Sequence, residues 1–127
     1  MVGLGTTLIQ GNYIHDFNAS GSPHYDGIQI DGPDSNVTIE HNTVINNQGW
    51  TSAVMVTNDL GSVSNITVDN NLLIGGGYTV YVQPKTGAMP NVVVTNNHIG
   101  PGQFGDCSAK RWRNGLGDHR QFGDGPR

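Results

Sequence analysis

The sequence lacks the features that define several common classes of protein. It has a single cysteine, Cys107, so no disulfide within the chain can stabilise the fold. No apolar run is long enough to span a membrane, and the residues after Met1 do not have the pattern of a signal peptide. Only 13% of the residues are charged and 7% are aromatic, whereas glycine occurs 19 times. This composition argues against a helical bundle and favours a single β-rich domain with many turns.

Basic side chains are almost absent from residues 1–102. Lys85 is the only Lys or Arg there, against seven acidic side chains, whereas residues 103–127 hold five basic and three acidic side chains. Nucleic acid is not an expected partner, because binding phosphates requires Lys and Arg on the contact face. No membrane is expected as a partner either, because no apolar run is long enough to span one. We expect a structured domain over residues 1–102 and an irregular basic tail over residues 103–127. The tail is a flexible segment, an improvised cap or the product of a shifted reading frame.

A long-period repeat is the strongest pattern in the sequence. Four segments align on one asparagine each: TTLIQGNYIHD, NVTIEHNTVIN, NITVDNNLLIG and NVVVTNNHIG. The shared residues are Asn12, Asn42, Asn71 and Asn97. A second set, at residues 27–31, 53–57 and 79–83, recurs in the same order between them. A period of about 26–30 residues indicates one structural unit that is repeated along a solenoid.

The repeated segments have the alternation of half-buried β-strands. In residues 37–40, for example, Val37 and Ile39 face one side and Thr38 and Glu40 the other. The shared asparagine and a second apolar pair follow too closely for a helix to intervene. We expect the asparagine to adopt the left-handed conformation of a sharp bend, and the four amides to stack as a ladder. The strands should pair in parallel, because an antiparallel sandwich would show two-residue hairpins and no long period.

The stretches DGIQIDGPDSNVTIEHNTVINN and SNITVDNNLLIGGGYTVYV resemble the right-handed parallel β-helix repeat proteins of the pectate-lyase-like superfamily. The resemblance covers residues 5–100 and implies an all-β, right-handed parallel β-helix of about four coils, which is shorter than is usual for the superfamily. It implies a secreted or cell-surface location and a polysaccharide bound along one parallel sheet. It does not select an activity, because the superfamily includes lyases, hydrolases and phage tail proteins. A non-catalytic structural or glycan-binding segment, of the tail-fibre or cell-surface type, is the alternative.

The resemblance places the polysaccharide on the outward face of the strands at residues 27–31, 53–57 and 79–83. The expected substrate-binding residues are Gln29, Met55 and Tyr81 in one row, Asp31, Thr57 and Gln83 in the next, and Lys85 beside them. If the protein is an enzyme, the resemblance implies a polysaccharide lyase or a glycoside hydrolase. The mechanism of the pectate lyases is disfavoured, because residues 1–102 contain no arginine to act as the base.

Two pairs of residues are candidates for catalysis. His24 and Asp26 are close in sequence, and a histidine oriented by an acid could act as a base, although turns also favour these residue types. Glu40 and Asp69 occupy equivalent positions in adjacent coils, with backbones about 5 Å apart. They are either paired catalytic carboxylates, ligands of a calcium ion, or two neighbouring acids on a solvated surface. No other metal or cofactor is expected. Exposed coil ends favour end-to-end association of identical chains.

Overall fold

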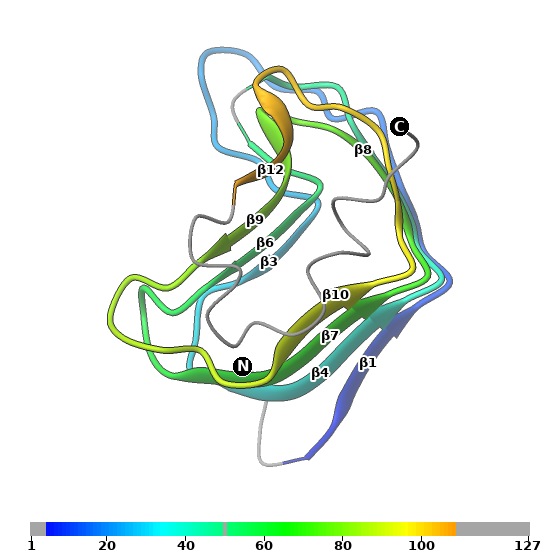
Figure 1. Ribbon diagram of the computed structural model, residues 1–127. Helices are drawn as coiled ribbons and strands as arrows, with labels where there is room; N and C mark the ends of the chain where they lie inside the picture. Colours follow the sequence, from blue (N-terminus) through cyan, green and yellow to red (C-terminus); the bar gives the residue numbers. More distant parts are fainter. Residues whose placement is uncertain (1–4, 50, 109–127) are drawn as a thin grey trace.

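The computed structural model describes residues 5–49 and 51–108 and shows a solenoid of parallel strands with three strands in each turn (Figure 1). The strands form three four-stranded sheets that run along the solenoid. Sheet A contains β1 (Thr7–Gln10), β4 (Asp34–Glu40), β7 (Val63–Asp69) and β10 (Val92–Thr95). Sheet B contains β2 (Tyr13–Ile14), β5 (Thr43–Asn46), β8 (Leu72–Gly75) and β11 (His98–Ile99). Sheet C contains β3 (Ile28–Ile30), β6 (Val54–Thr57), β9 (Tyr78–Gln83) and β12 (Gly105–Ser108).

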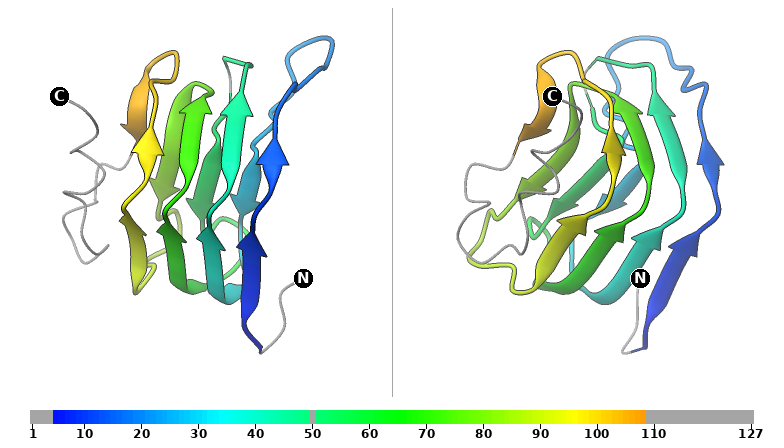
Figure 2. Two further views of the ribbon diagram at one scale, coloured as in Figure 1. Left: turned by 90° about the vertical axis from the view of Figure 1, so that its right-hand side faces the viewer. Right: turned by 45° about the vertical axis from the view of Figure 1, so that its right-hand side comes forward.

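The structure confirms the expected parallel β-helix. Neighbouring strands of all three sheets pair in parallel, and Figure 2 shows the successive coils stacked side by side. The solenoid makes about three turns rather than the four coils expected, because the four stacked strands of a sheet are joined by three turns of the chain. The described residues form no helix, and therefore none that could cross a membrane.

Columns of aliphatic side chains fill the interior. The register places Ile28, Val54 and Val80 above one another in sheet C, and Val44 and Leu73 in sheet B. All of these side chains are buried. Each fully buried Val, Leu or Ile contributes about 1.5–3 kcal/mol relative to leaving it exposed, so these columns are the main source of stability. The sequence predicted these columns correctly, because the regular spacing of the repeat brings equivalent positions into register.

An asparagine ladder runs through the bend between sheets A and B. Asn12 Nδ2 donates to Asn42 Oδ1 (2.9 Å), Asn42 Nδ2 to Asn71 Oδ1 (3.0 Å) and Asn71 Nδ2 to Asn97 Oδ1 (2.9 Å). Each of these oxygens also accepts the backbone N–H of the asparagine that donates to it. The amides therefore satisfy buried backbone groups as well as one another, which confirms the expected ladder.

The left-handed residue of this bend is not the asparagine. It is the residue before it, namely Gly11, His41, Asn70 or Asn96, with φ between 53° and 71°. The ladder amide of Asn42 donates to the backbone carbonyl of Glu40, two residues earlier, and the equivalent bond recurs in each coil. This bond closes a tight loop around the intervening residue, which must then take up the left-handed conformation. The sequence prediction was wrong by one position.

A second ladder, on the outside of the solenoid, was not predicted. Asn65 Nδ2 donates to Asn36 Oδ1 (3.0 Å), and Asn91 Nδ2 donates to Asn65 Oδ1 (2.9 Å). All three asparagines have a positive φ of 56–59°. They lie within or just before the strands of sheet A, where asparagine tolerates a left-handed backbone better than most residues.

The β-helix extends beyond the expected boundary at residue 102. Strand β12 pairs in parallel with β9, with Gly105 opposite Tyr78 and Ser108 opposite Tyr81. The segment Gly105–Ser108 lacks the alternation of aliphatic and polar residues by which the other strands were predicted. It was therefore missed, because its pairing depends on backbone hydrogen bonds, which the sequence pattern does not reveal. The remainder of the expected tail, residues 109–127, lies outside the described residues.

Candidate functional site

The outer face of sheet C carries the first predicted row of binding residues. Gln29 is in register with Met55, and Met55 with Tyr81, so the three side chains follow one another along the solenoid. Gln29 is exposed, and Met55 and Tyr81 are partly buried, whereas the residues on either side of Met55 in the strand are buried in the core. The strands are about 4.8 Å apart, so the row presents three side chains at a regular short interval.

The second row is only partly accessible. Asp31 is partly buried, and its Oδ2 accepts a hydrogen bond from Gln29 Nε2 (2.8 Å). Thr57 is in register with Gln83, as expected, but it is only 2% exposed. Its hydroxyl has no hydrogen-bond partner among the described residues. Thr57 therefore does not lie on the accessible surface. Its exposure was predicted from the alternation of side chains along the strand, which takes no account of the loops that follow the strands.

Lys85 lies in the loop that follows β9, where its side chain is exposed. Its backbone N–H donates to Asn58 Oδ1 (2.6 Å), and Asn58 Nδ2 donates to the carbonyl of Gly87 (3.0 Å). The buried side chain of Asn58 thus holds the loop against the preceding coil. This attachment fixes the position of the Lys85 backbone at the end of the face where the strands finish.

An aromatic cluster lies where the strands of sheet C begin. The rings of Tyr78 and Tyr81 meet edge to face with centroids 5.4 Å apart, and the rings of Tyr78 and Phe104 are 6.0 Å apart. Phe104 is 55% exposed. The pKa of Tyr81 is raised above its ordinary value, first by burial and then by the nearby Tyr78 and Asp26. The phenol of Tyr81 is therefore neutral at physiological pH and can both donate and accept a hydrogen bond.

Asp26 is held beside this cluster by the neighbouring coil. Its Oδ1 accepts the backbone N–H of Ser52 (2.9 Å) and the Ser52 hydroxyl (2.5 Å). His24 is exposed, and the only ion pair within residues 5–49 and 51–108 joins His15 and Asp16. The expected pair of His24 with Asp26 is therefore not formed, because the carboxylate is oriented by Ser52 instead.

Glu40 and Asp69 are in register on sheet A, as the spacing predicted, and so lie on a different side of the solenoid from the face of sheet C (Figure 1). Gln10 Nε2 donates to Glu40 Oε1 (2.9 Å). Asp69 accepts hydrogen bonds from the side chains of Asn70, Thr95 and Asn96, each at 2.9 Å. The described residues contain no group of three or more His, Cys, Asp or Glu side chains that could hold a metal ion.

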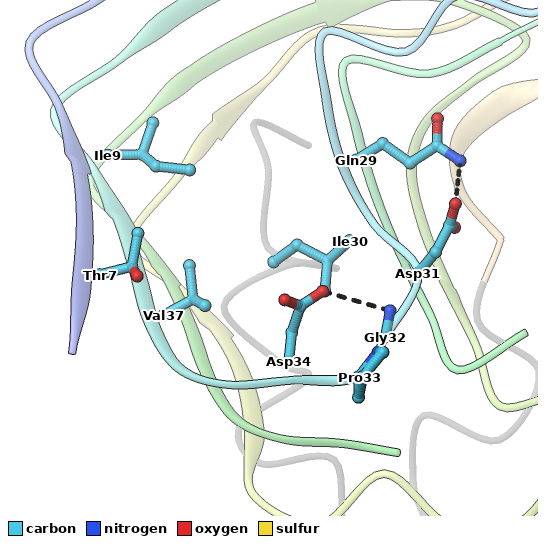
Figure 3. Close-up of a pocket in the computed structure, with 9 residues that line it drawn as sticks. All are labelled: Thr7, Ile9, Gln29, Ile30, Asp31, Gly32, Pro33, Asp34 and Val37. Carbon is cyan, nitrogen blue, oxygen red and sulfur yellow. Dashed lines mark hydrogen bonds between the residues drawn. The ribbon is translucent and has the colours of Figure 1, made fainter. Parts of the chain in front are cut away.

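A cavity of about 630 Å³ lies at the end of the solenoid formed by β1, β3 and β4. In Figure 3, Ile30 points toward Val37 and Ile9 across the cavity, whereas Gln29 and Asp31 lie on the other side of the backbone of β3. The Gly32 N–H donates to Asp34 Oδ2 (3.2 Å) at the rim. This cavity thus lies at the end of the aliphatic core, and Gln29 and Asp31 border it from the face of sheet C.

Comparison with known proteins identifies the family. A family model described as "Right handed beta helix region" matches residues 2–109. The chain belongs to the right-handed β-helix family. No curated protein and no solved structure gives a significant match.

In this right-handed β-helix protein, two residues near the candidate site, Ser52 and Phe104, were not predicted to take part in it, whereas Tyr78 was expected to flank the face. Ser52, Tyr78 and Phe104 follow Asp26 at equal intervals along the chain. This interval is the period of the strands of sheet C, so extending the same stacking to the residues just before Ile28 and Val54 would have brought Asp26 next to Ser52. The roles of Gln29, Met55, Tyr81 and Lys85 in binding remain predictions.

Proposed function

We propose that this β-helix protein binds an extended polysaccharide along the outer face of sheet C. The observation that carries the proposal is the continuous row of Gln29, Met55 and Tyr81, which ends at the aromatic cluster of Tyr78, Tyr81 and Phe104. Aromatic rings provide large, rigid apolar surfaces, and amide and phenol groups provide hydrogen bonds. Together they match the apolar faces and hydroxyl groups of a sugar chain.

Binding without cleavage is the role that the arrangement of acids supports. Hydrolysis of a glycosidic bond requires two carboxyl groups about 5–9.5 Å apart on either side of that bond. Asp26 and Asp31 lie at opposite ends of β3, about five residues or roughly 16 Å apart along an extended strand. Glu40 and Asp69 lie on sheet A, away from the row. The proposed role is therefore that of a glycan-binding solenoid segment.

Measuring affinity for a panel of soluble oligosaccharides by isothermal titration calorimetry tests this proposal. Tyr81→Ala should weaken binding of the preferred oligosaccharide by up to about tenfold, because the loss of an aromatic contact costs about 0.5–1.5 kcal/mol. Tyr13→Ala is the matched control, since Tyr13 is 63% exposed but lies on sheet B. The proposal is wrong if no oligosaccharide binds, or if both substitutions weaken binding equally. Release of reducing or unsaturated ends from the same oligosaccharides would show that the protein also cleaves its ligand.

A further inference from the structure

The carboxylate of Asp26 has one oxygen engaged and one available. Oδ1 accepts both hydrogen bonds from Ser52, which fixes the side chain at the start of β3. Among the residues that the structure describes, no hydrogen bond reaches Oδ2, although the residue is partly buried. A partly desolvated carboxylate oxygen in a fixed position is a strong acceptor for a charged donor.

The surroundings of Asp26 favour a cation. Asp26 contacts Ser52 in the next coil, and the residue after Ser52 donates its backbone N–H to the carbonyl of the residue after Tyr78, so Asp26, Ser52 and Tyr78 lie in successive coils. The carboxylate also contributes to the raised pKa of Tyr81, after burial and Tyr78. The faces of aromatic rings attract ammonium groups, with an energy of about 0.5–2 kcal/mol per contact. The rings of Tyr78, Tyr81 and Phe104 and the carboxylate thus form one side of a site with a negative potential.

The protein supplies no cation to this site within residues 5–49 and 51–108. Lys85 is the only Lys or Arg in these ranges, and it follows the other end of β9 in a loop held by Asn58. His15 is the only positively chargeable group in them that forms an ion pair, and its partner is Asp16. His24, two residues before Asp26, is exposed and forms no ion pair with it. A carboxylate beside aromatic rings that is paired with no Lys, Arg or His is complementary to a ligand that brings its own positive charge.

From these observations we infer that the polysaccharide bound on sheet C contains protonated amino sugars, with an ammonium group placed between Asp26 Oδ2 and the rings of Tyr78 and Tyr81. The inference rests on the proposed function and specifies its ligand class. A polyuronate is the disfavoured ligand, because its carboxylates would meet an acidic face that has Asp26 at one end and Asp31 at the other. The amide of Gln29 and the side chain of Met55 would contact the neighbouring sugar units.

The test compares three probes of equal length by calorimetry, at low salt and at a pH where amino groups are protonated. The probes are oligomers of β-1,4-linked glucosamine, the same oligomers fully N-acetylated, and oligogalacturonate. We expect the amino oligomer to bind about tenfold more tightly than its acetylated counterpart, as one charge-assisted contact with Asp26 and the rings would provide. This preference should decrease as salt is added, because salt screens the exposed charges.

Asp26→Asn tests the site itself. An asparagine can still accept the hydrogen bonds of Ser52, so the fold should be retained, and its far-ultraviolet circular dichroism should match that of the unmodified protein. We expect this variant to bind the amino and the acetylated oligomers equally. Asp16→Asn is the control, because it changes the net charge by the same amount at a side chain that follows β2 of sheet B and is 88% exposed, and it should retain the tenfold preference.

Each outcome has a distinct meaning. Equal affinity of the unmodified protein for amino and acetylated oligomers overturns the inference and leaves the proposed function in place. Tighter binding of oligogalacturonate than of the amino oligomer also overturns the inference. So does an equal loss of the preference for the amino oligomer in Asp16→Asn and Asp26→Asn, because it would show that binding depends on net charge alone. If none of the three probes binds and the wider oligosaccharide panel is also negative, the proposed function fails together with the inference.

Discussion

The buried asparagine ladder predicts a large and specific loss of stability for Asn71→Ala. The Asn71 side chain is 3% exposed and takes part in five hydrogen bonds. Its oxygen accepts the backbone N–H and the side-chain Nδ2 of Asn42, and its nitrogen donates to the carbonyls of Ile39 and Asp69 and to Asn97 Oδ1.

The expected cost follows from which groups remain unsatisfied. After truncation, the buried N–H of Asn42 loses its acceptor, at a cost of about 1–3 kcal/mol, and each remaining bond that is lost costs about 0.5–1.5 kcal/mol. Asn42 Nδ2 still donates to the carbonyls of Ile9 and Glu40, so part of the network survives. We therefore expect the free energy of unfolding to fall by about 3 kcal/mol, a large part of the roughly 5–15 kcal/mol typical of a domain.

Urea denaturation followed by far-ultraviolet circular dichroism measures this loss. Asn65→Gly is the matched control, because Asn65 belongs to the exposed outer ladder and has a φ of 56° that glycine adopts without strain. It should cost less than about 1 kcal/mol, since water can replace its two bonds. The reasoning is refuted if Asn71→Ala destabilises the protein no more than Asn65→Gly does.

Three further predictions concern other parts of the β-helix. Gly75→Ala should lower the free energy of unfolding, measured by urea denaturation, by about 3 kcal/mol or more, because the new Cβ would overlap the carbonyl oxygen of Asn46 in the neighbouring coil. Gly21 has a similar positive φ but open space around it, so Gly21→Ala is the control and should cost about 1–2 kcal/mol. Glu40→Gln should leave stability unchanged or raise it by up to about 1 kcal/mol, because like charges opposite one another on a sheet repel; a rise in melting temperature with calcium that Glu40→Gln removes would instead reveal a calcium site. Because the folded pKa of Tyr81 is raised, the folded state holds its proton more tightly, so stability should be lost as pH rises above the ordinary value of 10.0 toward the folded pKa. Tyr81→Phe should reduce this alkaline loss, and equal pH profiles for the two proteins would contradict the assignment.

The solenoid could be predicted from the sequence because its contacts repeat. A residue and its neighbour in the next coil are separated by one period, so the spacing of Asn42 and Asn71 gave their register directly. The same logic predicted the core columns and the row of Gln29, Met55 and Tyr81. Alternation within each strand then indicated which side chains face inward.

Features that depend on loops or on single atoms could not be predicted in this way. Thr57 is buried although the alternation of side chains along its strand places it on the outer face. Burial at the end of a strand also depends on the loops, whose lengths do not follow the period of the repeat. His24 and Asp26 were paired because they are neighbours in sequence, but in a parallel β-helix the adjacent coil offers the closer partner, here Ser52. The outer ladder at Asn36 and Asn65 was missed because the positive φ that lets these residues stack is a property of the folded backbone.

The inner asparagine ladder also bears on how such a protein can grow. Each amide donates in the same direction along the axis, to the oxygen of the following coil. A coil inserted between two others, with an asparagine at this position, would therefore find a donor on one side and an acceptor on the other, both already oriented for it. Coils of different length fit the same stack, because successive ladder asparagines are separated by 30, 29 and 26 positions within this one chain and the differences fall in the loops. Duplication of a single coil therefore lengthens the molecule without redesign of its interior, whereas insertion of one residue inside a strand would reverse which side chains face the core.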